Sequence, residues 1–211
     1  KYKSNSNSLK PLLSKKYQIG TDTITFHDGT MNFLNNIIPG LVKPYHNIIT
    51  PSNSWFAIKD ISEKYNINVI TSNVKIINNN EHIDFNDIIN HINSNTRMIC
   101  LVGPFLKNDF MKFCKDIDEY NIPILIDLCY YEFYSNLKEY VTIKEMLNCN
   151  ISTTKNIIMV NTFSKFYSLP GLNLSYSIAD DKLNSFIRNL VLYPINDLKE
   201  QVAAKAIIDV E

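Results

Sequence analysis

The chain reads NIIMVNTFSKFYSLPGLNLSYSIAD from Asn156 to Asp180. An apolar run breaks into hydroxyl side chains and one lysine, Lys165, and a Pro-Gly turn then leads to a second apolar run at residues 174–179. This pattern predicts a lysine at the end of a buried strand, surrounded by small hydrogen-bonding groups. A lysine after a strand is more often a solvated loop residue, so the rest of the chain has to decide between these two interpretations.

Composition and charge restrict the class of protein. With 211 residues, 45% of them apolar, the chain is long enough to bury a substantial core. Basic and acidic residues number 21 each, so no net charge attracts nucleic acid or an anionic membrane. No apolar run reaches the length of a membrane span, and the four cysteines include no C-x-x-C pair. We therefore expect a soluble, cytoplasmic protein with reduced thiols and no metal site.

Short apolar runs alternate with longer segments of helical periodicity. This alternation predicts an α/β fold with a mostly parallel seven-stranded sheet sandwiched by helices. The five glycines form neither G-x-G-x-x-G nor a Walker loop, which excludes the common nucleotide-binding functions of such a sheet. We expect strands at residues 23–26, 47–50, 68–71, 98–102, 122–126, 157–160 and 174–178. We expect helices at residues 30–38, 54–65, 84–93, 107–119, 181–190 and 197–210, and the Asn-rich segment 73–82 shows no functional pattern.

Asp127 ends the apolar segment PILID and is therefore expected at the carboxyl edge of the sheet, where open α/β folds bind ligands. Lys165 ends another strand at the same edge, so an acid and an amine can face one pocket. Pyridoxal phosphate chemistry needs both, because the amine forms a Schiff base with the cofactor aldehyde and the carboxylate keeps the pyridine nitrogen protonated. Tyr130 is near enough in sequence to reach the phenolic oxygen of the cofactor. The alternative is that Asp127 caps the next helix and Tyr130 packs in the core.

Two segments of the chain carry a family resemblance. They are IDLCYYEF at residues 126–133 and NTFSKFYSLPGLNLSYSIAD at residues 161–180. Both resemble signature segments of the fold-type-I, pyridoxal-phosphate-dependent aminotransferases, in particular the histidinol-phosphate aminotransferase group. Typical forms of that group read VDEAYIEF and RTFSKAFGLAGLRIGYAIA. Weaker similarity extends the resemblance over about residues 22–208.

The resemblance implies pyridoxal 5'-phosphate as the cofactor and gives each matching residue a role. Lys165 would be the Schiff-base lysine and proton shuttle, Asp127 the partner of the pyridinium nitrogen, and Tyr130 the partner of the phenolic oxygen. The other implied cofactor contacts are two hydroxyls beside the phosphate, two backbone amides at a helix start and a ring-stacking aromatic: Thr162, Ser164, Gly29, Thr30 and Trp55.

Two positions depart from the family pattern. Asn173 stands where the family has an arginine that holds the phosphate, so a charged contact is missing. The segment LVGPFLKND keeps only Pro104 of the family's Asn-Pro-x-Asn-Pro-Thr-Gly motif. In that motif Leu106 takes the place of the asparagine that contacts the phenolic oxygen.

The implied activity is amino-group transfer between an amino acid or amino-alcohol phosphate and a 2-oxo acid, in biosynthesis and by a homodimer. Residues 1–21 would be an N-terminal arm or linker, and residues 22–195 the cofactor-binding large domain. Residues 196–211 would start a helix that leads to an absent small domain. Two alternatives stay open: a catalytically degenerate homologue that acts as a scaffold or interaction module, favoured by Leu106 and Asn173, and a pyridoxal-phosphate-dependent decarboxylase or lyase on the same fold.

Overall fold

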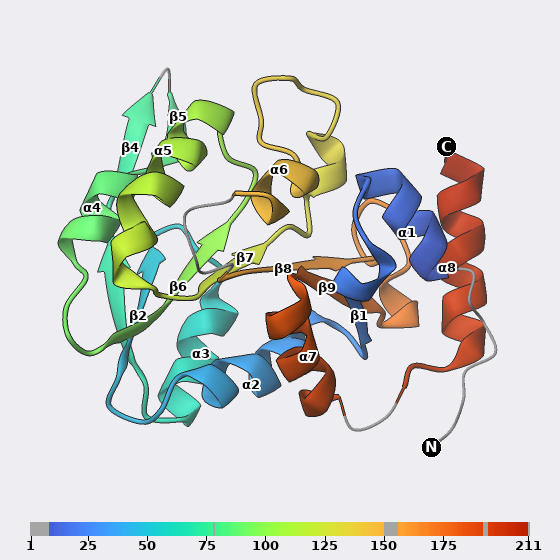
Figure 1. Cartoon of the computed structure of the whole chain (residues 1–211), viewed down its shortest axis with the longest axis horizontal. Coiled ribbons are helices and arrows are strands. Elements are labelled where there is room, and N and C mark those ends of the chain that lie inside the picture. Colours follow the sequence, from blue (N-terminus) through green and yellow to red (C-terminus); the bar gives the residue numbers. More distant parts are fainter. Residues whose placement is uncertain (1–8, 78, 150–155, 192–193, 211) are drawn as a thin grey trace.

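Seven strands form one sheet in the computed structural model, which describes residues 9–77, 79–149, 156–191 and 194–210 (Figure 1). Strand β9 (Ser175–Ala179) runs antiparallel to both of its neighbours, and the other adjacent strands are parallel. The predicted mostly parallel, seven-stranded sheet is therefore confirmed, and each predicted strand is present with its ends shifted by no more than two residues. In spatial order the sheet contains β1 (Ile24–His27), β9, β8 (Ile157–Thr162), β7 (Ile124–Asp127), β6 (Thr96–Val102), β2 (Asn47–Pro51) and β3 (Asn68–Ser72).

Helices cover both faces of this sheet (Figure 1). Side chains of β7 alternate between two apolar clusters, because Ile124 and Ile126 pack into one and Leu125 into the other. The Leu125 cluster lies beneath α2 (Thr30–Leu41), α3 (Phe56–Lys64) and α7 (Asp181–Leu190). The larger cluster lies beneath α1 (Leu9–Tyr17), α4 (Phe85–Asn90), α5 (Lys107–Ile117), α6 (Ile143–Leu147) and α8 (Asp197–Val210).

Helix α1 lies within residues 1–21, which the sequence predicts as an arm or linker. Leu9 and Leu13 are fully buried and lie one helical turn apart, on the face that packs into the larger cluster. Lysines on the other face of α1 hide this pattern in the sequence. From Leu9 onward the segment is therefore a packed element of the domain, whereas residues 1–8 lie outside the described part of the chain.

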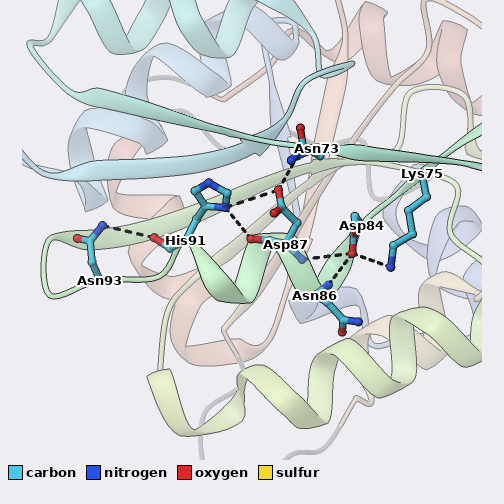
Figure 2. Close-up of polar contacts among 7 residues, drawn as sticks. All are labelled: Asn73, Lys75, Asp84, Asn86, Asp87, His91 and Asn93. Carbon is cyan, nitrogen blue, oxygen red and sulfur yellow. Dashed lines mark hydrogen bonds and ion pairs between the residues drawn. The ribbon is translucent and has the colours of Figure 1, made fainter.

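A hairpin of β4 (Val74–Ile77) and β5 (Asn80–Ile83) occupies most of the Asn-rich segment. Figure 2 shows the polar contacts that fix this hairpin to α4. Lys75 Nζ lies 2.8 Å from Asp84 Oδ1, and Asp87 accepts a hydrogen bond of 2.7 Å from the backbone just before β4. Asp84 also caps α4, because its carboxylate accepts hydrogen bonds from two backbone amides of the first turn. No helix in the described ranges is long and apolar enough to cross a membrane.

Candidate active site

The ends of three strands meet at the carboxyl edge of the sheet. In the parallel pair β7 and β8, Asp127 is paired with Val160. Strand β9 connects β8 to β1, because Ser175 is paired with both Thr162 and His27. The segments that follow β1, β7 and β8 therefore come together at one edge, although they are far apart in the sequence.

Asp127 is a buried carboxylate, with 8% of its surface exposed. Burial raises its pKa, while hydrogen bonds from the backbone and thiol of Cys129 and the positive charge of Lys165 oppose that rise. The Cys129 amide donates to Asp127 Oδ1 over 2.9 Å. The following 3₁₀ turn begins after Tyr130 and receives no side-chain cap, so the alternative that Asp127 caps a helix is wrong.

Lys165 and Tyr130 face each other across the ends of β8 and β7. The Lys165 ammonium lies over the Tyr130 ring, 5.8 Å from its centroid, which is a cation–π contact. Tyr130 is 46% exposed, so the alternative that it packs in the core is wrong. Lys165 is also exposed, and its amine is accessible to a small molecule from solvent.

Two hydroxyl groups shape the loop that carries Lys165. Thr162 Oγ1 lies 3.0 Å from Ser164 Oγ and accepts a hydrogen bond of 3.1 Å from the Ser164 amide. The Ser168 amide donates to the Lys165 carbonyl over 3.0 Å and closes the turn after the lysine. The loop is thus ordered by local hydrogen bonds, and it holds both hydroxyls just before the lysine.

Gly29 precedes the first turn of α2 in a conformation that favours glycine, with φ of 81°. A β-carbon at this position would collide with the side-chain amide of Asn173. Asn173 Nδ2 donates to the Asp28 carbonyl over 3.3 Å. No side chain caps the start of α2, so the amides of its first turn, beginning at Thr30, have no side-chain acceptor. We call the region formed by Asp28, Gly29, Asn173 and these amides the corner. The site therefore includes an uncapped helix terminus suited to an anion, and Asn173 lies against it.

Asn173 itself has a left-handed backbone conformation, with φ of 47° and ψ of 50°. Asparagine tolerates this conformation better than most residues, because its short side chain can form local hydrogen bonds. The residue thus fits the turn that connects Lys165 to β9. This fit accounts for an asparagine at a position where the family resemblance predicts an arginine.

Trp55 follows β2 at the same edge of the sheet, but β6 lies between β2 and β7. Its indole is half-buried, packs into the cluster beneath α2 and α3, and forms an edge-to-face contact with Phe56 at 6.0 Å. These contacts are those of an apolar anchor at the start of α3. The interactions described for Trp55 do not include Asp127, Tyr130 or Lys165.

Leu106 precedes α5 and forms an isolated bridge with Tyr140. It lines a cavity of about 430 Å³ between the loop after β6 and the β4–β5 hairpin. Its side chain has no polar group to offer a ligand. The structure therefore agrees with the sequence in giving this position no hydrogen-bonding role.

A buried polar network behind the lysine strand is not predicted from the sequence. Glu132 is 6% exposed and accepts hydrogen bonds of 3.1 and 3.2 Å from Asn161 Nδ2. It also accepts a short hydrogen bond from the Tyr17 hydroxyl, which lies 2.6 Å from the Tyr176 hydroxyl. Burial raises the pKa of Glu132 despite these hydrogen bonds. The network anchors β8 at Asn161, one residue before Thr162. The sequence signal for it is Glu132 itself, a glutamate within IDLCYYEF that the typical family form also has.

His27 ends β1 and is a second buried polar group near the site. It is 4% exposed, its Nε2 lies 2.8 Å from Ser177 Oγ, and its ring packs on Phe33 with 4.4 Å between centroids. Burial lowers its pKa to about 3, although Asp28 opposes this effect. His27 is therefore neutral at physiological pH and supports the turn before Gly29.

The geometry brings together an accessible amine, a buried carboxylate, a phenol, two hydroxyls and an uncapped helix terminus. An amine in this position can attack a carbonyl carbon, and the helix terminus with the hydroxyls can bind an anionic group. Of the predicted residues, Trp55 is the one whose described contacts lie apart from this group. No group of three or more His, Cys, Asp or Glu residues in the described part of the chain could hold a metal ion.

Comparison with known proteins identifies one family. A family model described as aminotransferase class I and II matches residues 4–209. The histidinol-phosphate aminotransferase of Aliarcobacter butzleri is 28% identical over 86% of this chain and 48% of its own length. That of Pelagibacter ubique is 23% identical over 97% of this chain and 55% of its own length. The chain thus spans about half the length of these curated relatives.

Solved structures show the same fold. The histidinol-phosphate aminotransferase of Sinorhizobium meliloti, in complex with pyridoxal-5'-phosphate, superposes with a TM-score of 0.82 at 16% identity. The match covers 100% of this chain and 57% of that one. The L-threonine-O-3-phosphate decarboxylase of Porphyromonas gingivalis superposes with a TM-score of 0.73 at 18% identity, over 98% of this chain and 63% of that one.

Proposed function

Because the chain belongs to the aminotransferase class I and II family, we propose that it binds pyridoxal 5'-phosphate through Lys165 and transfers amino groups. The proposed reaction moves an amino group between an amino acid or amino-alcohol phosphate and a 2-oxo acid. One observation carries the proposal: Asp127 ends β7 and Lys165 follows the adjacent parallel strand β8, at one sheet edge. The carboxylate and the amine match the ring nitrogen and the aldehyde of the cofactor.

The residues at this edge suit each part of the cofactor. The phosphate would lie at the start of α2, where Gly29 leaves room and the amides from Thr30 onward are not capped. The hydroxyls of Thr162 and Ser164 lie just before Lys165; Ser164 Oγ accepts from Thr162 and would donate to the same phosphate. Tyr130, beside the Lys165 amine, would donate to the phenolic oxygen. The family resemblance would add Trp55 as the ring-stacking aromatic, although its described contacts are with the cluster beneath α2 and α3 and with Phe56.

Three side chains would act on the reacting atoms. When bound, the cofactor supplies an aldehyde for amines and a ring that accepts electrons. Asp127 would hold the ring nitrogen in its protonated form, and its burial strengthens that charged contact. The Lys165 amine would take the proton from the substrate carbon as a general base and would then deliver it to a different atom as a general acid. Tyr130 would keep the Lys165 amine in position through the contact between ring and ammonium.

The remaining proposals concern the wider protein. We retain residues 22–195 as the cofactor-binding large domain, to which the packed helix α1 is added, and residues 196–211 as the start of a helix toward a small domain. The homodimer and the cytoplasmic location are likewise proposals. Both rest on membership of the family. They remain proposals because the chain spans only about half the length of the relatives it matches.

Two other functions have specific support. The uncharged Asn173 and the apolar Leu106 favour a homologue that keeps the scaffold without the activity. The likeness to the decarboxylase of P. gingivalis favours a lyase reaction at the same site. Both alternatives keep Lys165 in place. Under the lyase alternative, Lys165 would also bind the cofactor covalently.

A titration with pyridoxal phosphate tests the proposal. We expect a visible absorption band that saturates with cofactor in the wild-type chain and is absent from Lys165→Ala. Lys112→Ala, which removes an exposed lysine of α5, is the control and should behave as wild type. Absence of the band from the wild-type chain at saturating cofactor would contradict the proposal and favour the scaffold function. Release of carbon dioxide from an amino acid substrate would identify the lyase instead.

A further inference from the structure

Lys199, in the first turn of α8, reaches the turn between β1 and α2. Its Nζ lies 2.7 Å from Asp28 Oδ1, which makes an ion pair between residues far apart in the sequence. The Lys199 side chain is 27% exposed and that of Asp28 is 55% exposed. Asp28 immediately precedes Gly29, so the pair lies next to the uncapped start of α2.

The charges at this corner have to suit a phosphate dianion. The Asp28 carboxylate would repel such a group, because like charges this close disfavour each other. Asn173, which lies against Gly29, contributes hydrogen bonding without charge. Lys199 neutralises Asp28 and brings an ammonium group to the corner.

We propose that Lys199 is the residue that makes this corner positive enough for the cofactor phosphate, in place of the arginine that Asn173 replaces. It acts through Asp28 and by its own charge, and is therefore a positioning residue. The inference rests on the proposed function, since the anion is the phosphate of pyridoxal phosphate. It adds a group from α8, outside both signature segments, to the cofactor site.

A purely structural role for the pair is the competing explanation. Helix α8 is held without Lys199, because Ala203, Ala204 and Ile207 are buried in the larger apolar cluster. A partly exposed ion pair of this kind adds little to stability. Lys205 offers a matched control, since it pairs with Asp209 on the same helix at 69% exposure.

The experiment compares two ligands that differ only in the phosphate: pyridoxal phosphate and pyridoxal. Their affinities are measured by absorbance titration of the wild-type chain, Lys199→Gln, Asp28→Asn and the control Lys205→Gln. We expect Lys199→Gln to bind pyridoxal phosphate about fivefold to tenfold more weakly, with pyridoxal affinity unchanged. Asp28→Asn should bind pyridoxal phosphate at least as tightly as wild type, and Lys205→Gln should not differ from it.

Each outcome has one meaning. If Lys199→Gln keeps wild-type affinity for pyridoxal phosphate, or weakens both ligands equally, the proposal is overturned and the pair is structural. If Asp28→Asn weakens only pyridoxal phosphate, the assigned sign of the Asp28 charge is wrong and the proposal fails. If the wild-type chain binds neither ligand, the proposed function itself fails, and this result is distinct from the other two.

Discussion

The ammonium group of Lys165 lies over the ring of Tyr130, 5.8 Å from its centroid. Tyr130 follows β7 and Lys165 follows β8, so the contact joins the ends of two adjacent parallel strands. At the end of β7 the buried Asp127 carboxylate interacts with the positive charge of the lysine, which opposes the rise of its pKa on burial. This arrangement places the acid, the phenol and the amine within one small region at the sheet edge.

Asp127→Asn tests the role of the buried charge. Asparagine keeps the acceptor for the Cys129 amide, so the fold should be retained, but it cannot hold a protonated ring nitrogen through a charged contact. We expect affinity for pyridoxal phosphate to fall by about tenfold to a hundredfold, from a charged hydrogen bond of about 1.5–3 kcal/mol. The exposed Asp116→Asn is the control. Equal affinity in both variants would exclude Asp127 as a cofactor ligand.

Gly29→Ala tests the corner at the start of α2. The new methyl group would collide with the Asn173 amide, and φ of 81° is strained for alanine. We expect the free energy of unfolding to fall by about 2 kcal/mol and the affinity for pyridoxal phosphate to fall with it. Gly171→Ala is the matched control, because a β-carbon there meets no atom within 4 Å. The account of this corner is wrong if the two variants unfold at the same urea concentration.

His27→Gln tests the effect of a buried neutral imidazole on stability. The folded state lowers the pKa of His27 from 6.5 to about 3, so between these values the unfolded chain binds more protons. Its stabilising contribution is therefore present above pH 6.5 and is lost as the pH falls toward 3. Glutamine can keep a hydrogen bond to Ser177 but does not titrate. Urea unfolding at several pH values should show the wild type losing stability relative to His27→Gln as the pH falls, and parallel curves would refute the prediction.

Glu132→Ala tests the network behind the lysine strand. The substitution leaves Asn161 Nδ2 and the Tyr17 hydroxyl without their buried acceptor. We expect the free energy of unfolding to fall by about 2–4 kcal/mol, since each buried unsatisfied group costs about 1–3 kcal/mol. Glu63→Ala, an exposed position in α3, should change it by less than about 0.5 kcal/mol. A small effect at Glu132 would show that the network does not anchor β8.

The sheet was predictable because its strands are short apolar runs that end in polar residues. Asp127 and Lys165 stand out for this reason, since Asp127 ends one such run and Lys165 closely follows another at the same edge. Helix α1 was missed because the burial of Leu9 and Leu13 depends on α8, nearly two hundred residues away in the sequence. The contact of Lys199 with Asp28 depends on tertiary packing in the same way, and no local pattern marks it.

The site was predictable to a smaller extent than the sheet. The sequence indicates that Asn173 lacks a charge, but only the structure shows it against Gly29. The prediction of Trp55 as a ring-stacking residue rests on a weak motif, and its described contacts are those of an apolar anchor. Glu132 had a signal in the sequence, a carboxylate within an apolar and aromatic segment, but its partners come from α1 and β8.

The central claim is that the Lys165 amine binds the cofactor aldehyde, and one measurement tests it most directly. The wild-type chain is incubated with pyridoxal phosphate, reduced with borohydride, digested and analysed by peptide mass spectrometry. The account predicts a single stoichiometric pyridoxyl label, on Lys165. Absence of label, or label spread over other lysines with Lys165 unmodified, would contradict it.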